Sequence, residues 1–269
     1  MTMIIDFHSH IYPEDVAPKV LASTKNKVGI EVFGSGTPQG LKADMRKAGI
    51  EKAVVLPVAK TPGNVRPIND WIKSLSGDGL LPFGAIHPLM EGLEEELDLL
   101  AYQGFPGVKV VPVLQRLCPD GPRCYHLYEA LVARNMILVA HAGRAPTGEF
   151  EAYGTPERFA EVAETFPDLK IVLTHLGGLR MWDEVRESLL PSGKNVYFDS
   201  SYASFYLSPE EMAGMIREIG IDRVLFGTDY PWADASREIA LIRSLGFSAE
   251  EMESIFHGTA ERLIGGSIP

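Results

Sequence analysis

Two histidines lie two residues apart near the start of the chain, in the stretch IDFHSH that spans residues 5–10. Four of the first five residues are apolar, so this segment is predicted to form a strand. Residues i and i+2 of a strand share a face, which would place the His8 and His10 side chains side by side. Two adjacent imidazoles suit a shared ligand, and a metal ion is the first candidate. A hydrogen-bonded pair in a loop would show the same spacing, so other parts of the chain must decide.

Further side chains capable of chemistry follow apolar runs later in the chain. The runs MILVAH and KIVLTH end in His141 and His175, and RVLFGTD ends in Asp229. A fourth run, GVKVV, contains Lys109. Together with His8 and His10, these residues can supply three neutral imidazoles and a carboxylate, a suitable set of ligands for a divalent metal such as zinc. These residues are far apart in sequence, so the prediction requires a fold that brings them together.

Eight short runs have the composition of strands, and most are almost continuously apolar, as strands buried on both faces of a parallel sheet are. The predicted strands span residues 3–7, 52–58, 81–86, 107–111, 136–141, 170–175, 195–199 and 223–228. The segments between them read as amphipathic helices. Helix starts are predicted at Thr155, Ser208 and Ser248, the last with Glu251 in a capping box. The longest irregular stretch, residues 11–37, is predicted to be a loop.

Strand–helix alternation of this kind predicts an α/β fold, a (β/α)₈ TIM barrel formed as a single domain over residues 1–269. A doubly wound open sheet is the alternative, but no GxGxxG or Walker-type loop follows the first strand. In a barrel, the carboxyl ends of all strands meet at one face, and active sites lie there. We therefore expect the histidines and the aspartate to converge at that face as a metal site.

Composition excludes several classes of function. Asp and Glu number 36 against 25 Lys and Arg, a formal charge of −11, which argues against nucleic-acid and anionic-membrane partners. No apolar run approaches the roughly 18–20 residues that span a bilayer. The N-terminal residues do not form a signal-peptide pattern, so a cytoplasmic protein with a small-molecule substrate is expected. A homo-oligomer is compatible with the sequence, and Cys118 and Cys124 are expected to be free thiols.

Five motifs in a fixed order resemble the amidohydrolase superfamily. They are IDFHSH, VAHAG, LTHLGG, YFDSSY and LFGTDYPW, and they extend from one end of the chain to the other. The closest resemblance is to the amidohydrolase-related (amidohydrolase 2) branch, which includes amino-carboxymuconate-semialdehyde decarboxylase. The segment from His257 to Leu263 departs from the pattern, because relatives usually carry Asn-Ala before the Arg-Leu pair. It lies on the predicted last helix, away from the site.

The resemblance implies a metal-dependent enzyme and assigns roles to its residues. His8, His10, His141 and Asp229 would be the metal ligands, and His175 would contact the metal-bound water or bind a second metal. Zinc is the expected ion, with one per chain favoured over two. A bound cation lowers the pKa of its water from about 15.7 to about 7. The resemblance makes Asp229 and His175 the predicted catalytic residues. Asp229 would move the proton of the metal-bound water, and His175 would contact that water.

Four residues are candidates for substrate binding. Lys109 could be carboxylated and bridge two metals, or extend its charge from the barrel rim to solvent, but a free cation that binds a substrate carboxylate is favoured. Arg144 and Arg116 follow predicted strands, and in an acidic chain they favour an anionic substrate, although a solvated loop charge explains each equally well. Trp232 follows the last strand and could form an apolar wall of the pocket.

The resemblance leaves three functions open. The expected reaction is hydrolysis of an amide, lactone or ester of a small anionic substrate, in which metal-bound hydroxide attacks the carbonyl carbon. Non-oxidative decarboxylation of an aromatic or unsaturated carboxylic acid at the same site is the first alternative. A catalytically silent binding barrel is the second, and the complete ligand set argues against it. Phosphoesterases that begin with HxH would need an acidic ligand where Lys109 stands.

Overall fold

Parallel strands alternate with helices along the chain. The computed structural model describes residues 3–75, 77–146 and 151–265. The strands are β1 (Ile5–Ser9), β2 (Lys52–Val55), β3 (Leu80–Pro82), β4 (Gly84–Ala85), β5 (Gly107–Val110), β6 (Ile137–Ala140), β7 (Ile171–Leu173), β8 (Val196–Asp199) and β9 (Val224–Leu225). Their hydrogen-bonded pairs are all parallel. The eight predicted strand positions are therefore confirmed, with ends shifted by a few residues.

The strands form a barrel in two hydrogen-bonded parts, ordered β1-β2-β3 and β4 through β9. Only Phe83 separates β3 from β4, so these two are halves of the third barrel strand. Backbone hydrogen bonds join the first strand to the last, from Phe7 N to Phe226 O at 2.7 Å and from Asp229 N to His8 O at 2.8 Å. The predicted (β/α)₈ barrel is thus confirmed, and the doubly wound alternative is wrong.

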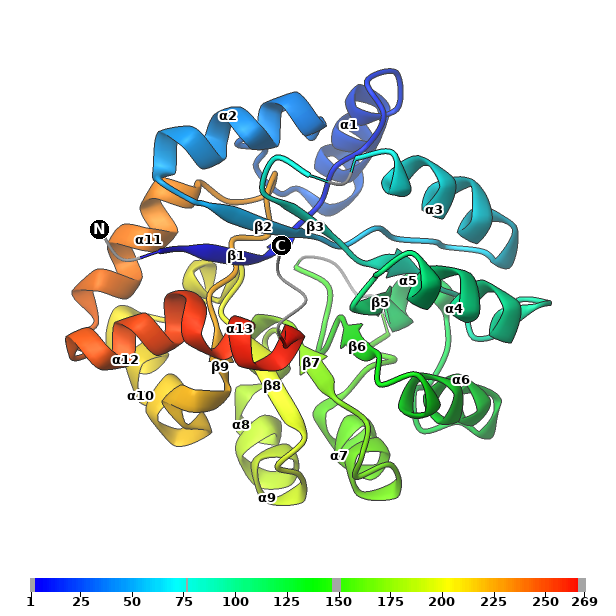
Figure 1. Ribbon diagram of the computed structural model, residues 1–269. Coiled ribbons are helices and arrows are strands. Elements are labelled where there is room, and N and C mark those ends of the chain that lie inside the picture. The colour runs from blue at the N-terminus through cyan, green and yellow to red at the C-terminus, as the bar shows by residue number, and fades with distance from the viewer. Residues whose placement is uncertain (1–2, 76, 147–150, 266–269) are drawn as a thin grey trace.

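Helices surround the strands in Figure 1, as expected for a barrel whose strands are apolar on both faces. They are α1 (Ala17–Val28), α2 (Pro38–Ala48), α3 (Val65–Lys73), α4 (Leu93–Tyr102), α5 (Pro112–Gln115), α6 (Pro122–Ala133), α7 (Pro156–Thr165), α8 (Trp182–Glu184), α9 (Leu190–Ser192), α10 (Pro209–Ile219), α11 (Ala235–Ser244), α12 (Ala249–Glu253) and α13 (Thr259–Ile264). Single turns of 3₁₀- or π-helix complete several of the connections.

The predicted helix starts agree with the structure. Ser208 and Ser248 begin α10 and α12, each in a complete capping box, and Thr155 is the N-cap of α7 without a side-chain bond. The loop predicted over residues 11–37 is wrong in part, because α1 occupies residues 17–28. The residue before α1 is Val16, whose side chain cannot cap a helix, so the start signal in the sequence is limited to Pro18 in the first turn.

Two apolar cores lie on either side of the strands. The outer core packs strand residues against the helices. The inner core fills the half of the barrel nearest the amino ends of the strands, and α13 lies across that end. The strand residues of the inner core are Ile5, Phe7, Val54, Ile137, Val139, Val172 and Leu225, together with Leu56 directly after β2 and Phe83 between β3 and β4. We refer to this group as the apolar half of the barrel interior.

A β-bulge in β1 changes which side chains face the interior. Asp6 pairs with Ala53, but the next paired residues are Ser9 and Val55, so β1 advances three residues while β2 advances two. The extra residue lets Phe7 join the apolar half while His8, the next residue, also contributes to a cluster of buried polar side chains. In a regular strand, two consecutive residues would point to opposite faces.

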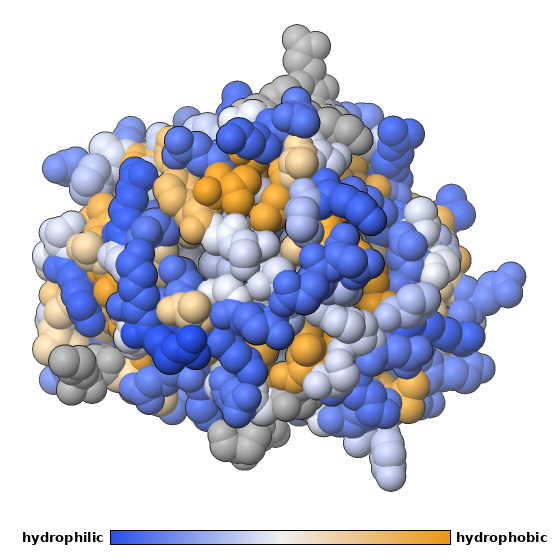
Figure 2. Space-filling view, turned by 90° about the horizontal axis from the view of Figure 1, so that it is seen from above, coloured by the Kyte–Doolittle hydropathy of each residue, from blue (hydrophilic) through white to orange (hydrophobic). Residues whose placement is uncertain are grey.

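The outer surface is mainly polar. On the side of the molecule drawn in Figure 2, hydrophilic residues predominate and hydrophobic residues form separate patches between them. Among the described residues, the large apolar side chains with substantial exposure are Phe33, Leu99, Tyr102, Leu114 and Tyr206. The helices of the described ranges are each too short or too polar to cross a membrane.

Candidate metal centre

Three predicted ligands meet at the carboxyl ends of β1 and β9. His8 Nε2 lies 3.1 Å from His10 Nε2, and Asp229 Oδ1 lies 3.5 Å and 3.3 Å from these two nitrogens. All three side chains are buried. We call His8, His10 and Asp229 the donor triad.

The hydrogen bonds of the two histidines leave the triad without a hydrogen at its centre. His10 Nδ1 lies 2.6 Å from Leu56 O, an oxygen that can only accept, so Nδ1 carries the hydrogen and Nε2 carries a lone pair. His8 Nδ1 lies 2.8 Å from Asp199 Oδ2, which fixes the same tautomer. Two nitrogen lone pairs and a carboxylate oxygen therefore face one another. This arrangement is repulsive unless a cation lies between them.

The separations within the triad fit a divalent ion. Ligand atoms that bond one ion at about 2.1 Å with angles of roughly 90–110° lie about 3.0–3.4 Å from one another. The three separations in the triad are 3.1, 3.3 and 3.5 Å. The donor set and its spacing thus agree with a divalent metal site, as the sequence predicts.

His141 and His175 form a second pair beside the triad. His141 Nδ1 lies 3.1 Å from His175 Nε2, and their other ring nitrogens lie next to carbonyl oxygens, those of Arg144 and Ser201. The His175 ring also stacks on His8, with 5.4 Å between the centroids. In the described ranges, His141 is absent from the groups whose ligand atoms all lie within 4.8 Å of one another. Its role as a metal ligand therefore stays a prediction.

Burial and charge set the protonation of the cluster. Burial, with the charge of Lys109 acting in the same direction, lowers the pKa of His8 to about 4. Burial likewise lowers the pKa of His141 and of His175 below the usual value, so all three imidazoles are neutral at pH 7. Burial acts to raise the pKa of Asp229, but the positive charges that His8 and His10 carry when they are protonated at low pH more than offset it. They hold the pKa of Asp229 well below its usual range, so the carboxyl is ionised at pH 7. Neutral imidazoles beside an ionised carboxylate are the protonation states that metal binding requires.

Two site residues have a backbone conformation that is uncommon outside glycine. The φ angles of His175 and Asp229 are 60° and 68°, in the left-handed region. Hydrogen bonds hold both residues there: His175 N donates to Asp199 Oδ1 at 3.0 Å, and Asp229 N donates to His8 O at 2.8 Å. Such conformations occur preferentially at functional sites, where the surrounding structure enforces them.

Lys109 is a buried cation with a free ammonium group. Its residue on β5 is 2% exposed, and within the described part of the chain Nζ has no hydrogen-bond partner. Burial lowers the pKa of Lys109 to about 8, while Asp199 and Asp229 act to raise it. A buried ammonium without a partner is costly, so this position favours the binding of an anion.

The other predicted substrate-binding residues lie near the same end of the barrel. Arg144 is exposed in the loop after β6, and Arg116 is exposed directly after α5. Trp232 is 7% exposed and packs in an apolar group with Leu179 and Tyr202. Their contact with a substrate stays a prediction.

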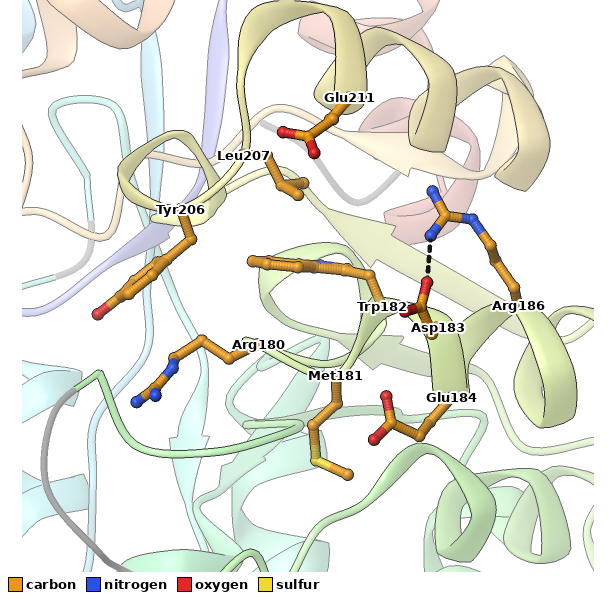
Figure 3. A pocket seen from close by; sticks show the side chains of 9 residues that line it. All are labelled: Arg180, Met181, Trp182, Asp183, Glu184, Arg186, Tyr206, Leu207 and Glu211. Carbon is orange, nitrogen blue, oxygen red and sulfur yellow. Dashed lines mark hydrogen bonds and ion pairs between the residues drawn. The ribbon is translucent and has the colours of Figure 1, made fainter.

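A separate cavity of about 410 Å³ lies beside this apolar group (Figure 3). Trp182 lies across the cavity, and its Nε1 donates to the backbone oxygen of His175 at 3.1 Å. The residues that line it are Arg180, Met181, Trp182, Asp183, Glu184, Arg186, Tyr206, Leu207 and Glu211. None of them is a residue that the sequence assigned to the site.

Two polar residues of the centre received no role from the sequence. Asp199 at the end of β8 and Ser201 are at most 1% exposed, and both contact His8 Nδ1. The stretch YFDSSY carries them, and its position at a strand end is the signal that could have found them. Asp-Ser-Ser after a strand is also an ordinary turn sequence, so the signal is weak.

Comparison with known proteins identifies the family. Residues 5–266 match the family model described as Amidohydrolase. The chain belongs to the amidohydrolase family. This confirms the resemblance, and with it the prediction of an enzyme. An uncharacterised protein of Sinorhizobium fredii, y4mH, is 24% identical over 297 residues, which cover 96% of each chain.

Two solved structures have the same fold. A TIM-barrel protein of Bordetella bronchiseptica, Bb4693, superposes with a TM-score of 0.78 at 22% identity, covering 98% of this chain and 99% of that one. The 5-carboxyvanillate decarboxylase of Novosphingobium aromaticivorans, in complex with manganese and 4-hydroxy-3-methoxy-5-nitrobenzoic acid, gives a TM-score of 0.72 at 17% identity, covering 97% and 96%. At these identities the similarity establishes the barrel fold.

Proposed function

We propose that this amidohydrolase hydrolyses the amide, lactone or ester bond of a small anionic substrate with the help of one divalent metal ion. The observation that carries the proposal is the donor triad, in which two imidazole lone pairs and a carboxylate face one another with no hydrogen between them. The free ammonium group of Lys109 adds a position for an anionic group of the substrate.

Each residue would have a separate task in this reaction. The triad, with Nδ1 of His141, would hold the ion, which supplies Lewis acidity and lowers the pKa of water. The second carboxylate oxygen of Asp229 would accept the proton of the attacking water and return it to the leaving group. His175 Nε2 would accept a hydrogen bond from that water and so orient it. Lys109 Nζ would bind a substrate carboxylate.

The recognition of the rest of the substrate would fall to the loops after the strands. Arg116 and Arg144 are exposed and could attract an anion to the barrel mouth. Trp232 would form an apolar wall beside the reacting group.

Zinc is the metal that we propose, with one ion per chain, because imidazole nitrogens dominate the donor set. Manganese is the alternative, since the solved decarboxylase binds manganese. Elemental analysis of the purified protein should find close to one equivalent of a divalent metal. A protein that holds no metal, and that added zinc or manganese neither binds nor activates, would contradict the proposed metal centre.

Decarboxylation of an aromatic carboxylic acid is a second candidate. The fold of a decarboxylase aligns with nearly the whole chain, and Lys109 could hold a carboxylate in this reaction too. The carbon–carbon bond to the carboxylate would break with loss of carbon dioxide. Asp229 would then deliver a proton to the carbon that lost it, so its carboxyl must start the reaction protonated or gain a proton from the substrate.

One experiment separates the two reactions. The metal-loaded enzyme is incubated with lactones, esters, amides and aromatic carboxylic acids, each with an anionic group, in water labelled with ¹⁸O or deuterium. Hydrolysis places ¹⁸O in the product acid. Decarboxylation releases carbon dioxide and places deuterium on the carbon. The Asp229→Asn variant, purified in the same way, should incorporate at least about 100-fold less ¹⁸O. Incorporation that survives in this variant and is lost when the protein is stripped of metal would contradict the assigned role of Asp229.

Further expectations concern the domain organisation, the location and the partners of the chain. The chain would act as one domain over residues 1–269, in the cytoplasm, on a small molecule. A homo-oligomer is compatible with it, and neither nucleic acid nor a membrane would be a partner. These points stay predictions.

A further inference from the structure

Asp199 and Ser201 connect the two histidines that flank the proposed reaction centre. Asp199 Oδ2 lies 2.8 Å from His8 Nδ1, and Asp199 Oδ1 accepts from the backbone N of His175 at 3.0 Å. His175 Nδ1 lies 2.9 Å from the backbone oxygen of Ser201. One short segment at the end of β8 therefore contacts the Nδ1 side of both imidazoles.

The Ser201 hydroxyl lies at the centre of this network. Ser201 Oγ donates to Asp199 Oδ1 at 2.5 Å, and lies 2.9 Å from His8 Nδ1 and 3.0 Å from His175 Nδ1. The ligand atoms of His8, His175 and Asp199 lie close enough together for a metal ion. The hydroxyl already occupies the space between them, so this group is a hydrogen-bond network and not a second metal site.

Asp199 accepts four hydrogen bonds through its two oxygens. Oδ1 accepts from His175 N, from Ser201 N at 3.1 Å and from Ser201 Oγ, while Oδ2 faces the ring of His8. Since both oxygens only accept, His8 must carry its hydrogen on Nδ1. Ser201 O has the same effect on His175. In both rings the Nε2 lone pair then points away from the segment and toward the donor triad and His141.

We propose that Asp199 and Ser201 are positioning residues, which fix the tautomer and ring orientation of His8 and His175 and thereby set the metal affinity of the centre. This inference rests on the proposed metal site. Carboxylate partners of ligand histidines commonly act in this way, and their loss typically weakens metal binding by about 10–100-fold.

The variant Asp199→Asn makes the sharpest test, because it changes the hydrogen-bond pattern with almost no change in shape. The amide oxygen is required by the three donors on the Oδ1 side. The amide NH₂ must then face His8 Nδ1, and this nitrogen can accept only after the ring hydrogen moves to Nε2. That hydrogen would point into the donor triad and oppose a metal ion. We expect metal affinity to fall by about 100-fold, the upper end of the range.

The experiment measures two properties of each variant at pH 7.5. Histidine ¹⁵N NMR of the metal-free protein reports which nitrogen of His8 carries the hydrogen, with the signal assigned from its loss in His8→Gln. Competition with a chelator reports the affinity for zinc. For Asp199→Asn we expect the Nε2–H form of His8 together with the weakened affinity. The tautomer of His8 is read without metal. If the protein binds no metal, the proposed function is refuted, but the NMR measurement still decides whether Asp199 fixes the tautomer of His8.

Two further variants act as graded controls. Ser201→Ala removes the central hydroxyl but leaves Asp199 Oδ2 and Ser201 O in place, so both tautomers should persist and affinity should fall by about 3–10-fold. Asp6→Asn changes another buried carboxyl near His8. Its contact with His8 is to the backbone N, at 3.0 Å, and not to the ring, and its other hydrogen bonds come from Thr228. Its zinc affinity should stay within about threefold of the original protein.

Two results would overturn the inference. One is an Asp199→Asn protein in which His8 keeps its hydrogen on Nδ1 and zinc affinity changes no more than in Asp6→Asn. The other applies if Asp199→Asn does not fold, and it is a Ser201→Ala protein whose zinc affinity is unchanged. If Ser201→Ala instead loses zinc affinity by about threefold or more while its urea midpoint is unchanged, the role of Asp199 and Ser201 is supported.

Discussion

The two halves of the barrel interior are built from the same strands and differ in almost every physical respect. β1 supplies Phe7 to the apolar half and His8 to the polar half, and β6 with the residue that follows it supplies Val139 and then His141. The apolar half is stabilised by non-directional packing. The polar half is formed by the donor triad, His141, His175, Asp199 and Lys109. It consists of lone pairs and carboxylates that hydrogen bonds hold in place, together with the Lys109 ammonium group, which has no hydrogen-bond partner among the described residues.

This difference indicates that residues for stability and residues for chemistry are separated along β1 and β6 by only one or two positions. The apolar half can tolerate a change of shape only at a cost in folding free energy. The polar half contains groups whose partners are not all present in the chain, so changes there should affect function more than stability. Substitutions in the two halves test this directly.

The largest effect on stability is expected for Phe7→Ala. Phe7 is fully buried, and its ring packs edge-on against Phe83 with 5.8 Å between the centroids. Removal of the ring leaves a cavity in a packed core and should lower the free energy of unfolding by about 3–5 kcal/mol. Urea unfolding measures this. A loss below about 1 kcal/mol would show that the apolar half does not carry the stability assigned to it.

The largest effect on activity is expected for Asp229→Asn. The amide cannot accept a proton from water, so turnover should fall by at least about 100-fold. Asparagine adopts the left-handed backbone of this position as readily as aspartate does, so the free energy of unfolding should change little. Steady-state kinetics and urea unfolding of the same preparation give both values. Turnover near that of the original enzyme would remove Asp229 from the mechanism.

Much of the fold could be predicted from the sequence, because it depends on local patterns. Nearly continuous apolar runs located all eight strands, and capping residues located the starts of α7, α10 and α12. α1 was missed because no capping side chain precedes it. The β1 bulge was missed as well, since the register of two strands 40 or more residues apart depends on packing that no local pattern encodes.

The site was predictable where residue type and strand end coincide. His8, His10 and Asp229 do meet at the predicted face. Asp199 and Ser201 were not assigned, because their importance comes from contacts with His8 and His175, which only the folded chain creates. The separation of His141 from the donor triad, with His175 beside it, likewise depends on loop geometry after β6 and β7.

Lys109 offers a test of intermediate size of the difference between the two halves. It is a buried polar group on β5 whose Nζ has no hydrogen-bond partner among the described residues. In Lys109→Met, metal content should stay at one ion, and KM for an anionic substrate should rise by about 10–100-fold through loss of a charge-assisted hydrogen bond. Stability should stay equal or increase, since an unpaired buried cation is removed. Two ions per chain that fall to one on mutation would instead show that Lys109 is carboxylated and bridges metals.

The smallest expected effect on the metal centre concerns Asp6, whose carboxyl lies beside the polar half. It accepts hydrogen bonds from His8 N at 3.0 Å, Thr228 N at 2.9 Å and Thr228 Oγ1 at 2.6 Å. Burial raises the pKa of Asp6 to about 7, above its value near 3.9 in the unfolded chain. Between these two values the folded protein keeps a proton that the unfolded chain releases. Asp6 therefore makes the folded state less stable as pH rises from about 4 to 7.

His8 has the opposite effect over almost the same range. Its pKa is lowered to about 4, below its unfolded value near 6.5, so the unfolded chain binds a proton that the folded protein does not. Stability from His8 thus increases as pH rises from about 4 to 6.5, and the contributions of His8 and Asp6 nearly cancel.

Asp6→Asn removes the contribution of Asp6 and leaves that of His8. In the metal-free protein, the free energy of unfolding should then rise more steeply with pH, by up to about 1.4 kcal/mol per unit between about pH 4.5 and 6.5. Urea unfolding across this range that gives equal slopes for both proteins would show that Asp6 is ionised in the folded state.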